Sequence, residues 1–94
     1  MACSHKAILL GNDPIMNKPY LVRAEWDDDA EVWVATSDDV PGLVTEAATI
    51  EALDEKLRVM VPELLEANGC LPANGAIAVE LLARRFTLTA TVVS

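Results

Sequence analysis

Few side chains in this sequence could carry chemistry. His5 is the single histidine, and Cys3 and Cys70 are the two cysteines, far apart from each other in the chain. A Cys–His or Ser–His pair would have to recruit His5, which lies in the least regularly patterned part of the sequence. We therefore expect a protein that is not an enzyme and that binds no cofactor.

The densest group of carboxylates is Asp27-Asp28-Asp29. Such a run could attract a hard cation, but a dedicated calcium loop spaces its ligands around a central Gly and closes with a Glu at a fixed distance. That spacing is absent around Asp29. We interpret the run as a polar turn, and we expect no metal site.

Acidic residues dominate the regular part of the chain. The formal net charge is −8, and residues 20–54 contain ten acids against one base, Arg23. Proteins that bind nucleic acid cluster Lys and Arg, so a phosphate backbone is not the expected partner. The negative field can steer a basic protein; the alternative is a solvated acidic surface that only aids solubility.

Length and composition predict one small domain. Ninety-four residues, 52% of them apolar, suffice for one sheet packed on one layer of helix. No apolar run approaches the roughly 20 residues that cross a bilayer, so we expect no membrane segment. Two isolated cysteines and no signal-peptide pattern favour the cytoplasm. We interpret residues 1–15 as a loosely held N-terminal arm and residues 16–94 as the single domain.

Alternating apolar residues predict a hairpin at the start of that domain. Residues 20–26 place one apolar set on a common face: Tyr20, Val22, Ala24 and Trp26. Residues 27–30 have turn composition, and residues 31–36 form the return strand. In that strand we expect Val32 and Val34 to point inward and Trp33 to lie on the opposite face.

A helix with clear boundary signals follows the next turn. Pro41-Gly42 turns the chain sharply before a third strand at residues 43–47. Thr49 is a good N-cap, and Asn68-Gly69 is a typical helix stop. The expected buried stripe is Ile50, Leu53, Leu57, Met60, Val61 and Leu64. Pro62 interrupts this stripe, and we expect a kink or a restart there.

Residues 77–93 are β-branched and alternate, but their apolar parity changes near residues 83–85. The change indicates a bulge, a bend or two separate strand pieces. The elements together predict an α+β fold. We expect an antiparallel sheet of three to four strands packed on one helix, in the order β-β-β-α-β.

One continuous pattern spans residues 20–68. It comprises Trp26-Asp27, the run at residues 30–43, and Thr45-Glu46-Ala47 before the capping Thr49. Its most specific part is Asp39-Val40-Pro41-Gly42-Leu43. This pattern resembles the HicB-like antitoxin superfamily, and residues 63–68 extend the resemblance to its small uncharacterised branch.

The resemblance implies one helix on an antiparallel sheet, a further strand after the helix, and self-association as a homodimer or higher homo-oligomer. It also implies a partner, a small basic RNA-cleaving toxin that is neutralised by binding. Full antitoxins usually continue into a DNA-binding segment, whereas only Val93-Ser94 follow Val92 here. We therefore expect no direct contact with nucleic acid.

We predict a non-catalytic module that binds a protein through an acidic turn and an exposed aromatic side chain. The predicted partner-binding residues are Glu31, Trp33, Asp38, Asp39 and Pro41. The alternative is an orphan structural domain without a toxin partner. In that case the C-terminal strand would use its free edge to pair with another copy of the chain.

Overall fold

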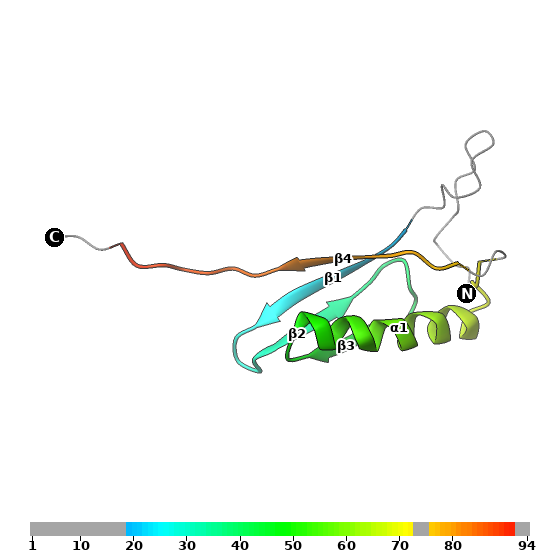
Figure 1. The fold of residues 1–94 in the computed structure, drawn as a ribbon, viewed down its shortest axis with the longest axis horizontal. Helices are drawn as coiled ribbons and strands as arrows, with labels where there is room; N and C mark the ends of the chain where they lie inside the picture. The colour runs from blue at the N-terminus through cyan, green and yellow to red at the C-terminus, as the bar shows by residue number, and fades with distance from the viewer. Residues whose placement is uncertain (1–18, 73–75, 92–94) are drawn as a thin grey trace, which may run out of the picture.

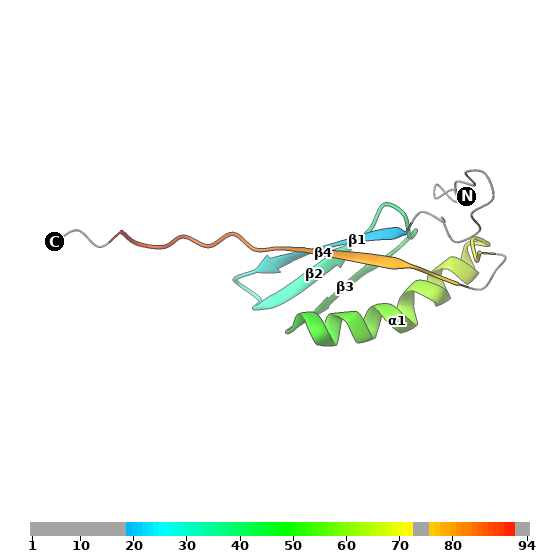
Figure 2. The same cartoon turned by 45° about the horizontal axis from the view of Figure 1, so that its top comes forward.

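A four-stranded sheet carries one helix on one of its two faces (Figures 1 and 2). The computed structural model describes residues 19–72 and 76–91. The elements are β1 (Tyr20–Asp27), β2 (Val32–Thr36), β3 (Val44–Ala47), α1 (Ile50–Ala67) and β4 (Val79–Arg84). The α+β class and the β-β-β-α-β order are therefore confirmed. His5, Cys3 and the predicted arm lie outside the described residues.

The sheet is mixed, with the strand order β3-β2-β1-β4. β2 is antiparallel to β1 and to β3, whereas β4 runs parallel to β1. The expectation of an antiparallel sheet is thus wrong for β4. Its direction follows from α1, whose 18 residues rise about 27 Å and carry the chain back along the sheet. The next strand consequently starts at the end of the sheet where β3 started.

The register of the hairpin decides which side chains of β2 face the helix. Trp26 lies opposite Trp33, and Ala24 lies opposite Ala35. Opposed residues share a face of the sheet, so Trp33 and the fully buried Ala35 point toward α1. The expected orientation of β2 is therefore wrong: Val32 and Val34 lie half-buried on the other face, which we call the open face.

The core lies between α1 and the helix-facing side of the sheet. The buried apolar residues are Tyr20, Val22, Ala24, Ala35, Val40, Leu43, Ala47, Leu53, Leu57, Val61 and Leu65. Leu65 is absent from the predicted stripe, while Ile50, Met60 and Leu64 are only partly buried at its margins. Small residues on β1, β2 and β3 let the helix pack closely on the strands.

Both predicted ends of α1 are confirmed. The Thr49 hydroxyl accepts a hydrogen bond from the Ala52 amide at 3.0 Å. Gly69 has φ +68°, and the Asn68 side-chain amide donates to the Leu64 carbonyl at 2.8 Å. Pro62 lies inside one continuous helix, so the expected restart does not occur. Buried Val61 and Leu65 hold the turns on both sides of it against the core.

β4 ends at Arg84, and residues 85–91 continue as an extended segment (Figure 1). We call residues 85–91 the C-terminal segment. It has no strand partner among the described residues, and it leads away from the sheet. The predicted break near residues 83–85 coincides with this end of the paired strand.

Candidate functional site

The two tryptophans meet at the end of the sheet where β1 turns into β2. Their ring centroids are 5.4 Å apart and the rings stand edge to face, at 64°. Both side chains are half-buried, so each ring offers part of its surface to solvent. We call Trp26, Trp33 and the connecting residues 27–31 the hairpin end.

Carboxylates build the turn of the hairpin end. Asp27 accepts hydrogen bonds from the backbone amides of Asp29 and Ala30, at 3.0 and 3.2 Å. Asp28 accepts one from the indole N–H of Trp26 at 2.7 Å. Glu31 has φ +57° and closes the turn through its amide. Asp29 and Glu31 are exposed, so their charges face solvent beside the tryptophans.

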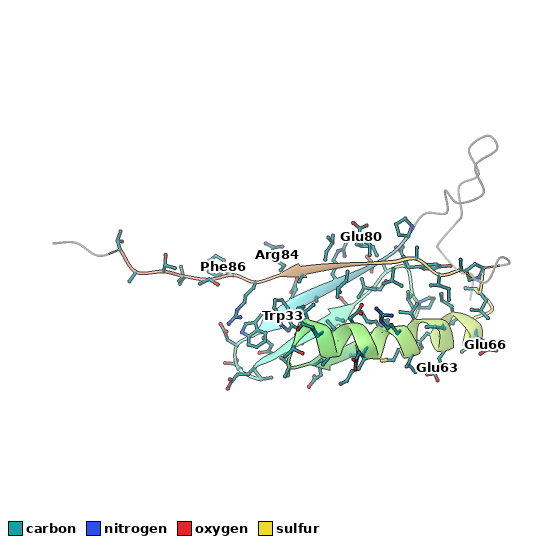
Figure 3. All side chains as sticks on the ribbon, viewed as in Figure 1. Trp33, Glu63, Glu66, Glu80, Arg84 and Phe86 are labelled. Atoms are coloured by element: carbon teal, nitrogen blue, oxygen red, sulfur yellow. The ribbon has the colours of Figure 1, made fainter. Side chains whose placement is uncertain are left out.

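A guanidinium already occupies one tryptophan face. The central carbon of the Arg85 guanidinium lies 4.3 Å from the centroid of Trp26. This is a cation–π contact, for which Trp provides the most favourable ring. Figure 3 shows Phe86 on the chain that leaves the sheet beyond Arg84, and Arg85 between these two residues makes the contact where the C-terminal segment begins. The hairpin end can therefore accept an arginine.

The second acidic turn, residues 37–42, is tied to the start of β1. The Ser37 hydroxyl donates to the Leu21 carbonyl at 2.6 Å and accepts from the amides of Asp39 and Val40. Asp39 accepts from the Leu21 amide at 2.8 Å. The Asp39 carboxylate thus holds two parts of the backbone together.

Asp38 is the exposed acid of this turn. Its side chain is 90% exposed and lies 3.4 Å from the guanidinium of Arg23, a pair in open solvent. Pro41 is half-buried, and Gly42 takes φ +82°, which explains the sharp turn. Of this turn, Asp38 is the acidic side chain most accessible to another molecule.

The five predicted partner-binding residues fall in two places. Glu31 and Trp33 belong to the hairpin end, whereas Asp38, Asp39 and Pro41 lie beyond the other end of β2. A five-residue strand spans about 17 Å, so one small contact does not join the two groups. The sequence pattern indicated residue types but not this separation.

Sequence reasoning missed a groove between α1 and β4. Its volume is about 310 Å³, and it is lined by Asp54, Leu57, Arg58, Val61, Pro62, Ile77 and Val79. At its rim Arg58 pairs with Asp54 at 3.0 Å. The alternation of Ile77 and Val79 in the sequence was its signal, since both of these residues line the groove.

The described residues contain no cluster of three or more His, Cys, Asp or Glu suited to a metal ion. Within the same residues, no helix is both long and apolar enough to span a membrane.

In a comparison with known protein families, residues 19–91 match a domain of unknown function, DUF1902. The chain belongs to the DUF1902 family. This DUF1902 chain is also 51% identical to a solved structure, that of a hypothetical protein from the extremely thermophilic bacterium Thermus thermophilus. The match has a TM-score of 0.60 and covers 79% of this chain and 100% of that chain. No curated protein matches this chain.

Proposed function

We propose that this DUF1902 protein is a non-catalytic, HicB-like module whose hairpin end binds a basic protein. The observation that supports the proposal is the arrangement of two half-exposed tryptophans beside exposed carboxylates, with a guanidinium already on one ring. The HicB-like assignment rests on the sequence pattern of residues 20–68, and its implied partner is a small basic RNA-cleaving toxin.

The chemistry of the hairpin end suits arginine. The face of an indole ring attracts a cation, and a carboxylate next to the ring can accept hydrogen bonds from the same guanidinium. Tryptophan and arginine are also the residues most often found at the energetic centre of protein interfaces. A partner arginine can stack on Trp33 or take the place of Arg85 on Trp26.

The charge of the whole chain supports the same partner class. A net charge of −8 produces a long-range field that accelerates encounter with a basic protein. The exposed Asp29 and Glu31 contribute to this field and lie in the same turn region as the two tryptophans. The net charge of the chain and the composition of the hairpin end thus both favour a basic protein as the partner.

Co-purification from the native host tests the proposal. The variant Asp29→Lys with Glu31→Lys reverses two charges at the hairpin end. Its matched control, Glu63→Lys with Glu66→Lys, makes the same change on exposed residues near the end of α1 (Figure 3). We expect the first variant to lose a basic partner and the control to retain it. Equal retention or equal loss by the two variants would contradict the proposal.

A further inference from the structure

The C-terminal segment exposes large apolar side chains along an extended backbone. Phe86 and Leu88 are 81% and 84% exposed, more than any other large apolar residue described. Residues 85–91 have no strand partner among the described part of the chain. An extended segment of this composition, with its backbone groups open, can add to the edge of a sheet.

The alternation of β4 continues into this segment. Leu81 packs on the core and Arg85 contacts Trp26, so the odd-numbered residues lie on the helix side. Phe86 and Leu88 therefore continue the open face, in line with Leu82, which is 51% exposed. Along that face the apolar Leu82, Phe86 and Leu88 are therefore in one row, interrupted by Arg84.

β4 is the last strand of the sheet, so one of its edges has no neighbouring strand among the described residues. The same edge continues along residues 85–91. The opposite edge of the sheet, β3, is only four residues long. The longest open edge is therefore that of residues 79–91.

We propose that residues 81–91 pair antiparallel with the same residues of a second copy of the chain. A two-fold axis normal to the sheet relates the two copies. Because both copies use the same strand edge, the contact is symmetric and joins only two chains. Opposed residues then share a face, so Phe86 and Leu88 of one copy lie beside the open-face residues of the other. The two four-stranded sheets become one sheet of eight strands.

The basic residues exclude two registers of this pairing. An axis at Arg84 or at Arg85 would place each arginine opposite its own copy, and like charges directly opposite destabilise a strand pair. An axis at Phe86 avoids both arrangements. It places Phe86 opposite Phe86 and Leu88 opposite Arg84, whose long aliphatic stem can cover the leucine.

Light scattering over a range of concentrations tests this inference independently of the proposed basic partner. We expect the wild type to dimerise, and Phe86→Asp with Leu88→Asp to weaken the dimer at least tenfold. The control is Val44→Asp with Val59→Asp, which changes two other exposed apolar residues, on β3 and α1. A monomeric wild type, or equal weakening by both variants, overturns the inference.

Oxidative cross-linking tests the register. Phe86→Cys, in a chain with Cys3→Ser and Cys70→Ser, brings two thiols together at the axis within disulfide range. Val59→Cys in the same background is the control. We expect the Phe86→Cys protein to form a covalent dimer at least tenfold faster than the control. Equal rates overturn the proposed register.

Discussion

Single residues of the second acidic turn have different tasks although they look alike in the sequence. Asp38 is in open solvent, and its pair with Arg23 is of the exposed kind that contributes little to stability. The neighbouring Asp39 accepts from the Leu21 amide and is partly shielded from water. Adjacent carboxylates thus divide into one that is accessible to a partner and one that holds the fold.

Replacing Asp39 with Ala should lower the free energy of unfolding by about 1–3 kcal/mol, because the Leu21 amide loses its acceptor. Asp38→Ala is the matched control and should change the free energy by less than about 1 kcal/mol. Urea denaturation of both variants measures the difference. Equal effects would show that the Asp39 bond does not stabilise the turn.

This pair shows what the sequence could and could not reveal about the site. Asp38, Asp39 and Pro41 were predicted as binding residues because they form an acidic Pro-Gly turn in the strongly acidic part of the chain. Nothing in the pattern indicates that Asp39 turns back to the amide of Leu21, since that residue is 18 positions away. Side-chain contacts across strands depend on register, which the sequence did not determine.

At the scale of helices and strands, the sequence predicted the ends of the helix correctly but did not predict how the strands pair. The cap Thr49 and the stop at Asn68-Gly69 were predicted because they depend on neighbouring residues alone. The faces of β2 were predicted wrongly, because valines look more suited to a core than Ala35 does. The register Trp26–Trp33 decides the outcome, because it turns Ala35 toward the helix, where this residue is fully buried.

Enlarging Ala35 tests the orientation of β2. Ala35→Leu should lower the free energy of unfolding by about 1–3 kcal/mol, because it overfills the contact between β2 and α1. Val34→Leu, on the open face, should change it by no more than about 0.5 kcal/mol. Thermal or urea unfolding distinguishes them. A larger cost for Val34→Leu would favour the opposite orientation of the strand.

Pro62 offers a second test within α1. It has no amide hydrogen to donate within the helix, so Pro62→Ala should raise the free energy of unfolding, by up to about 3 kcal/mol. Circular dichroism during urea unfolding measures this change. The exposed Glu63→Ala, one position later, is the control and should alter stability by less than about 0.5 kcal/mol. A destabilised Pro62→Ala protein would mean that the proline ring itself packs favourably.

The parallel direction of β4 is a property of the whole molecule, because it depends on how all the elements are connected. The sequence indicated a strand after the helix, but it did not indicate which edge that strand would join. Pairing with β1 places the last residues of β4 beside Trp26 and sends the C-terminal segment past the hairpin end. One consequence of the topology is therefore that a basic residue from the end of the chain reaches the acidic, aromatic end of the sheet.

The two proposed interactions use different parts of the molecule. A basic partner is proposed to bind the hairpin end, whereas a second copy is proposed to pair along β4 and the C-terminal segment. Arg85 lies between them, because it contacts Trp26 and is also part of the pairing strand. The charge reversals at Asp29 and Glu31 should consequently leave the dimer intact.

Tryptophan fluorescence tests the central claim most directly. Both tryptophans of the chain lie at the hairpin end, so fluorescence excited selectively in tryptophan reports on this site. We predict that an arginine-rich peptide changes it saturably and more strongly than a lysine peptide of equal charge. We also predict that Asp29→Lys with Glu31→Lys weakens binding at least tenfold more than Glu63→Lys with Glu66→Lys. Equal responses to the two peptides and equal losses in the two variants would contradict the account.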